Sequence, residues 1–195
     1  CEKPLAANAA QAEALVALAR LRGVFLMEAL WTRYLPALRV AEGWLRAGRI
    51  GRLRALQSSF GFHVPYDPAH RCFAPALAGG ALLDIGVYNL SLSQWALALQ
   101  GEPGPPRLQA AGALAPSGVD LRCAVQMAYA DGTVSQFSCA LDSRHENALH
   151  LYGERGRIVL GPHCWEPVQA TLWVDDQAPE TVHAPFERNG FEYQI

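Results

Sequence analysis

The sequence predicts an α+β domain: a mostly antiparallel, open sheet with helices on one face, preceded by one helix and one strand of a different α/β layer. Three observations predict it. Apolar residues recur with a helical period in the segments before residue 48, and they alternate with a strand period from residue 50 onward. The dipeptide Asp131-Gly132 separates two alternating runs, as in a β-hairpin. The 195 residues are 51% hydrophobic and 17% charged, which suits one globular domain or one domain with a piece of another.

The first thirty residues are interpreted as loop, helix and strand. Asn8 is suited to begin a helix and Gly23 to end it, with an apolar stripe between them. The run "VFLMEA" (24–29) is short and apolar, so we expect a buried strand, in the manner of a parallel sheet. The chain begins with Cys1 rather than Met, and its last residues, "ERNGFEYQI", resemble a helix that is just starting. We therefore expect a fragment that is cut at both ends.

From residue 31 onward the pattern predicts two helices followed by a meandering sheet. "YLPALRVAEGWLRAG" (34–48) is amphipathic, with leucine and alanine on one face and charged residues on the other. A long strand is expected in 51–64, and the hairpin joins 121–129 to 133–141. Shorter strands are expected at 147–152, 157–160 and 169–174. The Pro-rich segment 64–78 is a long loop, and loops of that length are often functional.

Composition excludes several classes of function. A net charge of −2 gives no basic surplus for nucleic acid, and no uncharged apolar run is long enough to predict a membrane span. The five cysteines are scattered without a CxxC pair, which favours a reducing compartment, most simply the cytoplasm. His145 and His150 fall on opposite faces of any strand, and no serine lies in a GxSxG setting. Neither a metal site nor acyl transfer is predicted.

The stretch "GGALLDIGVYNL" (79–90) carries the clearest candidate chemistry. In a helix that starts near Gly80, Asp84 and Tyr88 lie four residues apart and project to the same side. Gly86 leaves a neighbouring flank of backbone bare, as close approach by a ligand would need. A structural role fits as well, because an acid in the first turn balances the helix dipole and tyrosine is often half-buried.

Two further segments are candidates. Lys3 precedes Pro4, and a cis bond there would determine where the lysine points, although a solvated surface lysine fits equally. Glu28, Trp31 and Arg33 crowd the junction between the predicted strand and the next helix, where ligands of open α/β sheets bind. The same junction could be a domain joint with an aromatic plug.

Taken together, these segments resemble the glucose–fructose oxidoreductase/inositol dehydrogenase (Gfo/Idh/MocA) family, and within it the branch of dimeric dihydrodiol dehydrogenase and glucose–fructose oxidoreductase. The resemblance covers essentially the whole chain, in the family's order. It is carried by "EKP" (2–4), "EALWTRYLP" (28–36), "YDPAHRCFAPALAGGALLDIGVY" (66–88) and "DGTVSQFSCAL" (131–141). It implies an NAD(P)-dependent oxidoreductase in which residues 1–30 end a Rossmann domain. Residues 31–195 would then form an α/β domain for substrate binding and oligomerisation, a homodimer or homotetramer through the open sheet.

The resemblance also implies residue roles. Lys3, Asp84 and Tyr88 would be catalytic, with Tyr88 as general acid/base, its pKa lowered by the Lys3 ammonium, and Asp84 orienting Lys3 or the substrate. Hydride would move between NADP or NAD and a hydroxyl-bearing carbon of a sugar, polyol or dihydrodiol. The residues implied to bind cofactor are Glu2, Lys3, Pro4, Trp31 and Arg33, and those implied to bind substrate are Arg71, Phe73 and Tyr88.

Two departures from the family pattern leave an alternative open. No GxGxxG phosphate-binding loop occurs in the sequence, and "ALAGG" stands where relatives often show "ELGGG". The chain alone is therefore not expected to hold a dinucleotide well. The alternative is a non-catalytic sugar-binding or oligomerisation module of the same fold.

Overall fold

One mixed sheet organises the fold. The computed structural model describes residues 1–101 and 104–195, in which eight strands form a single sheet in the order β2-β3-β4-β1-β5-β6-β7-β8. Their bounds are β1 (Leu53–Gly61), β2 (Arg107–Leu114), β3 (Asp120–Ala128), β4 (Val134–Ala140), β5 (Leu149–Gly153), β6 (Gly156–Leu160), β7 (Gln169–Val174) and β8 (Glu180–His183). All neighbouring strands are antiparallel except β1 and β4, which are parallel. The predicted mostly antiparallel sheet is confirmed.

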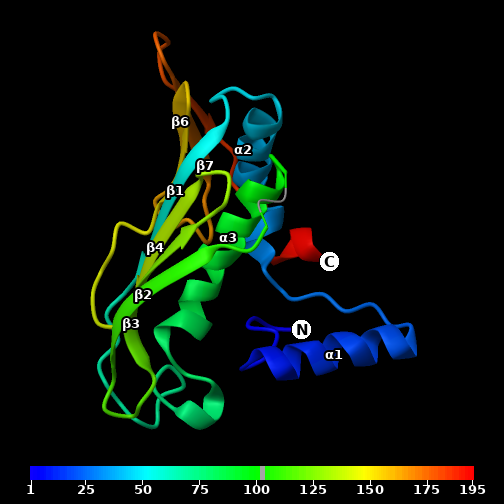
Figure 1. Cartoon of the computed structure of the whole chain (residues 1–195), viewed down its shortest axis with the longest axis vertical. Coiled ribbons are helices and arrows are strands. Elements are labelled where there is room, and N and C mark those ends of the chain that lie inside the picture. Colours follow the sequence, from blue (N-terminus) through cyan, green and yellow to red (C-terminus); the bar gives the residue numbers. More distant parts are fainter. Residues whose placement is uncertain (102–103) are drawn as a thin grey trace.

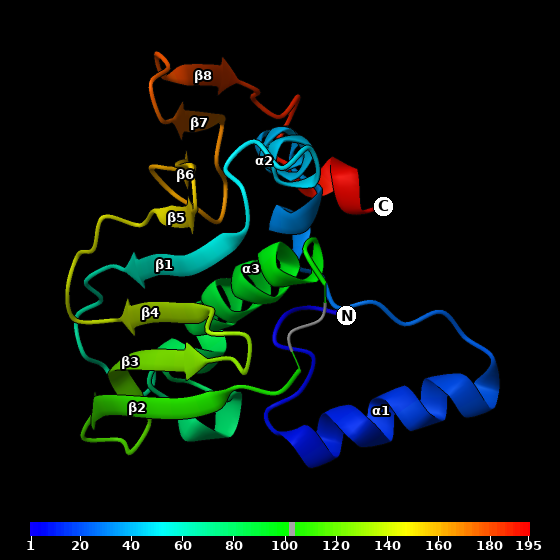
Figure 2. The ribbon, with the colours of Figure 1, turned by 45° about the horizontal axis from the view of Figure 1, so that its top comes forward.

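Two helices cover one face of this sheet. They are α2 (Pro36–Arg46) and α3 (Val87–Ala98), and no helix of the described residues lies on the opposite face (Figures 1 and 2). The third helix, α1 (Ala9–Arg22), lies away from the sheet beyond α3 (Figure 2). Four short helical turns complete the described part of the chain: η1 (Trp31–Tyr34), η2 (Pro75–Leu77), the π-helical η3 (Leu82–Gly86) and η4 (Phe191–Gln194). The predicted placement of helices on one face is confirmed.

The hydrophobic core fills the space between the sheet and these two helices. Leu38 and Leu45 of α2, Leu92 of α3 and Leu56 of β1 are almost completely buried there. Each leucine buried in this way contributes about 1.5–3 kcal/mol of transfer free energy. Pro36 occupies the first position of α2, where its missing N–H costs no hydrogen bond. The core therefore fixes α2 and α3 against the sheet and positions the residues on α3.

Several local sequence signals are confirmed. Asn8 caps α1 by accepting a hydrogen bond from the Gln11 N–H at 3.0 Å, and Gly23 ends the helix with φ of 62°. The β3–β4 hairpin turns at Gly132, whose φ of 86° suits glycine. The short strands expected after residue 147 correspond to β5, β6 and β7.

The strand predicted at residues 24–29 is wrong. This segment is extended but belongs to no strand, and the side chains of Val24 and Phe25 are 59% and 87% exposed. Its backbone hydrogen bonds to Cys1, through Met27 and Ala29, are too few to make a ladder. The edge strands β2 and β8 were not predicted. Both strands are mostly exposed, and β2 also lacks an alternation of apolar residues.

By length and composition alone, the helical segment Pro75–Ala98 could cross a membrane. However, 61% of its most apolar stretch is buried inside the domain. That is the pattern of a core helix of a globular fold.

Candidate active site

A π-helical turn at the start of the α3 segment places the buried Asp84. Asp120 of β3 anchors the turn, since its Oδ2 accepts the Leu82 N–H at 2.6 Å. π turns of this kind are rare and are often found at functional sites. A Cβ at Gly86 would lie 3.0 Å from Cys139 Sγ and 3.0 Å from Leu82 Cδ1. The bare flank expected to admit a ligand is thus filled by a thiol of the sheet, which corrects our interpretation of this glycine.

Asp84 is the hub of a small ionic network. Its Oδ1 accepts hydrogen bonds from Lys3 Nζ and Arg71 Nη1, each at 2.9 Å, and Lys3 also donates to the Asp84 carbonyl oxygen. Cys72 Sγ lies 3.7 Å from Oδ2. Burial alone would raise the pKa of Asp84, but the hydrogen bonds and charges of Arg71 and Lys3 outweigh it and lower the pKa. Asp84 is therefore a carboxylate that binds Lys3, which is one of the two partners that the resemblance implies for it.

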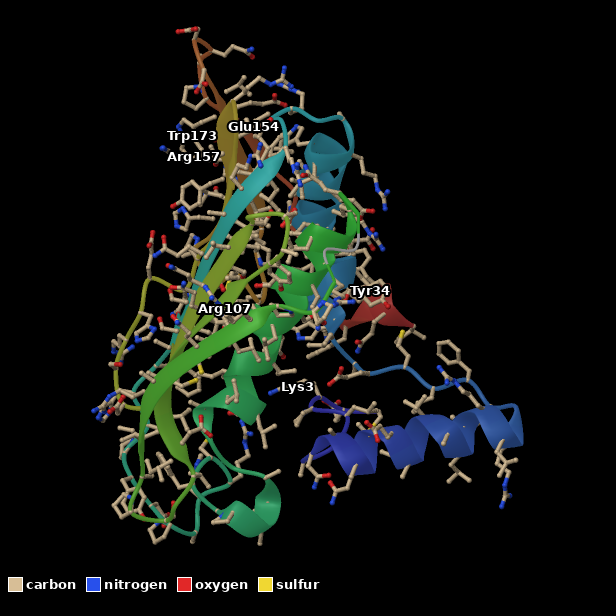
Figure 3. The ribbon with its side chains drawn as sticks, viewed as in Figure 1. Lys3, Tyr34, Arg107, Glu154, Arg157 and Trp173 are labelled. Carbon is tan, nitrogen blue, oxygen red and sulfur yellow. The ribbon has the colours of Figure 1, made fainter. Side chains whose placement is uncertain are left out.

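Tyr88 lies next to this network but is not hydrogen-bonded to Lys3. The Lys3 ammonium is 5.2 Å from the centre of the Tyr88 ring, and Figure 3 shows Lys3 reaching toward α3. The Tyr88 hydroxyl accepts a hydrogen bond from the Trp31 indole N–H at 3.3 Å. Burial raises the pKa of Tyr88, and the negative charge of Asp84 raises it further. The hydrogen bond from Trp31 lowers this pKa but does not outweigh the burial. The expectation that Lys3 lowers this pKa is wrong, because burial dominates and Lys3 donates to Asp84 instead.

Phe60 and Trp31 contact Tyr88, and further aromatic rings from distant segments pack on these two residues. Phe60 of β1 packs edge-on against Tyr88, with ring centres 5.6 Å apart, and stacks on Trp165 at 4.0 Å. Trp31 contacts Phe191 of η4 at 4.6 Å. We call these four residues, Trp31, Phe60, Trp165 and Phe191, the aromatic wall. Three of them escaped the sequence analysis, since no local pattern links residues 60, 165 and 191.

The loop between β6 and β7 brings Trp165 to the site. Its backbone carbonyl accepts a hydrogen bond from the Thr32 hydroxyl of η1, and its ring stacks on His163 with centres 4.8 Å apart. The negative charge of Glu166 from the same loop also contributes to raising the pKa of Tyr88. This loop is a part of the site that sequence reasoning missed.

The remaining candidates are placed differently. Arg33 donates to the Ser91 hydroxyl and carbonyl at 2.6 and 3.0 Å, and it borders a separate hollow of about 380 Å³ with Glu28. Phe73 is fully buried and packs on Tyr66, so it has no surface to offer a substrate. Two residues remain beside Lys3 in the N-terminal segment: the exposed Glu2, and Pro4, which follows a cis Lys3–Pro4 bond.

Comparison with known proteins agrees with this architecture. The model of the GFO/IDH/MocA C-terminal domain matches residues 38–159. A trans-1,2-dihydrobenzene-1,2-diol dehydrogenase from Oryctolagus cuniculus is 36% identical over 194 residues, covering 100% of this chain and 57% of its own length. The bovine protein of that name (Bos taurus) is 36% identical over 88% of this chain and 50% of its own. The chain thus spans about half the length of the curated relatives it matches.

Solved structures share the fold along the whole chain. An aldose-aldose oxidoreductase from Caulobacter crescentus, complexed with glycerol, superposes with a TM-score of 0.85 at 25% identity, covering 100% of this chain and 58% of its own. A 3-ketoreductase from Actinomadura kijaniata, in complex with NADP and TDP-benzene, gives a TM-score of 0.81 at 25% identity, covering 99% and 59%.

Proposed function

Because the chain belongs to the GFO/IDH/MocA family, we propose that its complete gene product is an NAD(P)-dependent oxidoreductase. It would transfer a hydride between the nicotinamide and a hydroxyl-bearing carbon of a sugar, a polyol or a dihydrodiol. The observation that carries the proposal is the meeting of Lys3, Asp84 and Tyr88 beside the aromatic wall, although the first of these is 81 residues from the second. Relatives named for dihydrodiol and aldose oxidation and for ketone reduction support these substrate classes.

The residues present fit one end of such a cofactor. Flat apolar rings beside a phenol and an ammonium suit a planar, polar-edged ring, because aromatic faces stack and the polar groups determine its orientation. No residues of this sequence match the loop that binds the pyrophosphate of such a cofactor, because the sequence contains no GxGxxG motif. When bound, the nicotinamide would supply the hydride donor or acceptor. The groups that would lie near it are Lys3, with its neighbours Glu2 and Pro4, and Trp31.

Proton transfer is the task we assign to Tyr88. Its raised pKa keeps the phenol protonated at neutral pH, which favours proton donation to a carbonyl oxygen over proton removal from an alcohol. An indole N–H can only donate, so in the bond to Trp31 the phenol oxygen is the acceptor and its own proton stays available. Such general acid assistance is typically worth about 10²–10⁴ in rate.

Lys3 would hold the reacting oxygen. An ammonium group has three N–H donors, and two of them are bound to the carboxylate and the carbonyl of Asp84. The third remains for a substrate oxygen. Asp84 thus acts as a positioning residue, and Arg71, which shares its Oδ1, supports it from the solvent side.

We propose further that residues 1–30 belong to a dinucleotide-binding domain and residues 31–195 to the substrate-binding domain. The exposed apolar side chains of α1 and the segment after it support this division. Leu15, Leu18 and Leu21 of α1, with Val24 and Phe25, form an apolar surface that the rest of such a domain would bury.

We also propose that the open face of the sheet joins two or four copies of the protein. A row of four glutamines crosses this face in register, Gln109, Gln126, Gln136 and Gln57, and it lines a hollow of about 560 Å³. Each amide both donates and accepts, so two copies can pair without charge conflict. Further along the face, the Arg157 guanidinium lies 4.5 Å above the Trp173 ring (Figure 3). Light scattering should show that Gln136→Lys dissociates the oligomer; an unchanged mass would refute this interface.

The experiment that tests the function uses the complete gene product. NADPH and NADH are each combined with ketoses and aldoses, and NADP⁺ and NAD⁺ are each combined with sugars, polyols and dihydrodiols. Oxidation or reduction of the cofactor is followed by absorbance. We expect turnover with at least one carbonyl substrate. Binding of a sugar without turnover of any substrate would favour the alternative, a non-catalytic binding module.

A further inference from the structure

Two cysteines face each other across the β3–β4 hairpin. Cys123 and Cys139 are directly opposed in the antiparallel register, and their sulfur atoms are 3.2 Å apart. Directly opposed residues on antiparallel strands bring their Cβ atoms within about 4.5–5.5 Å. A disulfide has an S–S bond of about 2.05 Å, so each sulfur would need to move by only about 0.6 Å. Both cysteines are free thiols in this structure.

We propose that Cys123 and Cys139 form a redox modification site, which closes to a disulfide on reaction with a low-molecular-weight disulfide such as oxidised glutathione. The proposal rests on the opposed thiols alone and is independent of the proposed oxidoreductase activity. The site would act directly beneath the candidate active site. Cys139 Sγ packs against Gly86, which lies two residues from both Asp84 and Tyr88.

The two thiols differ in accessibility, which determines the order of the reaction. Cys139 is completely buried, whereas Cys123 is half-buried near the edge of the sheet. The residue opposite Cys123 on the outer strand β2 is Gly112, which has no side chain to cover the thiol. Cys123 is therefore the sulfur that a solvent-borne reagent meets first.

The electrostatics of the pair support the same order. The hydrogen bond with Cys139 lowers the pKa of the Cys123 thiol, while that bond and burial raise the pKa of Cys139. The thiolate is the reactive form of cysteine, so Cys123 is the better nucleophile.

The chemistry balances in two exchange steps. The Cys123 thiolate attacks one sulfur of oxidised glutathione, which forms a mixed disulfide and releases one glutathione thiolate. Cys139 then loses its proton and attacks Cys123 Sγ, which forms the intramolecular disulfide and releases the second glutathione. The two protein thiols are oxidised by two electrons, and oxidised glutathione is reduced to two glutathione molecules.

The test uses the full chain with Cys1→Ser, a substitution that removes an exposed thiol. The protein is incubated with oxidised glutathione, its remaining thiols are alkylated, and the product is analysed by intact mass and peptide mapping. We expect the loss of two thiols without a retained glutathione, and a peptide that joins Cys123 to Cys139. Dithiothreitol should restore both thiols.

Two variants trap the separate steps. With Cys139→Ser, one glutathione should remain on Cys123; with Cys123→Ser, Cys139 should stay reduced under the same conditions. Peptide mapping of the Cys1→Ser protein decides the question even where a further variant fails to fold. The proposal is overturned if all four thiols stay free in the folded protein, if glutathione stays on Cys123 despite Cys139, or if another pair is joined.

Discussion

Replacing Asp84 by asparagine is the perturbation that the ionic network predicts most sharply. Asparagine keeps the size of the side chain and one acceptor oxygen, but it removes the charge that Lys3 and Arg71 share. The ammonium of Lys3, whose side chain is only 17% exposed, then loses its anionic partner. The expected result is a loss of folding stability that depends on pH.

The size of the loss follows from the exposure of the two partners. Hydrogen bonds to charged groups contribute about 1.5–3 kcal/mol each when they are shielded from water. The hydrogen bond from Lys3 is shielded in this way. The Arg71 side chain is 66% exposed, so the hydrogen bond from Arg71 contributes only the surface value of about 0–1 kcal/mol. Since asparagine still accepts a hydrogen bond, we expect the free energy of unfolding to fall by about 2 kcal/mol at pH 7.

The pH dependence has a definite sign. The pKa of Asp84 is lowered in the folded protein, so its contribution is complete above the pKa of an unfolded carboxyl, about 3.9. It disappears as the pH falls through the lower folded pKa. Urea unfolding between pH 3 and pH 8 should give a constant difference between the two proteins above pH 5 that shrinks below pH 4. Asp142→Asn, which breaks the more exposed pair with Arg122, is the matched control and should cost less. A difference that is absent at pH 7, or equal at all pH values, would refute the reasoning.

Three other predictions follow from the contacts of Tyr88 and Gly86. Trp31→Phe removes a hydrogen bond that lowers the pKa of Tyr88, so NMR of ring-labelled tyrosine should report a higher pKa; in Trp95→Phe, which replaces an equally buried tryptophan, it should be unchanged. Gly86→Ala should lower the free energy of unfolding by about 1 kcal/mol, because overpacking against Cys139 outweighs the gain in helix propensity. Adding Cys139→Ala should recover part of that loss in chemical denaturation, and strictly additive losses would contradict the contact. In the complete gene product, kcat for carbonyl reduction should stay level from pH 7 to about 10 and fall above it, since the raised pKa keeps Tyr88 protonated; a decline that begins near pH 8 would argue against Tyr88 as the acid.

Local signals accounted for most of the fold. Caps, turn residues and apolar periods are properties of neighbouring residues, which is why α1, α2 and the β3–β4 hairpin could be predicted from the sequence. The parallel pairing of β1 with β4 joins segments about 80 residues apart, and no local pattern encodes it. The segment 24–29 is apolar like a strand, but a strand also needs a neighbouring ladder, which its sequence does not reveal.

In the candidate site, too, the residues on one local segment could be predicted and those brought together by distant segments could not. Asp84 and Tyr88 could be predicted because they lie on one helical segment, and Lys3 was added through the resemblance to a family. Trp165 and Phe191 could not be predicted, since a loop and a terminal turn bring them against Phe60 and Trp31 through tertiary contacts. The direction of the Tyr88 pKa was mistaken for a related reason, as burial depends on the whole fold.

The turnover of Tyr88→Phe in the complete gene product, measured with the best substrate of the panel, is the most direct test of the proposed chemistry. Phenylalanine keeps the ring that packs on Phe60 and removes only the hydroxyl. We predict that kcat falls by about 10²–10⁴ while the affinity for NADPH, from fluorescence titration, stays the same. An unchanged kcat would remove Tyr88 from the reaction and contradict the account.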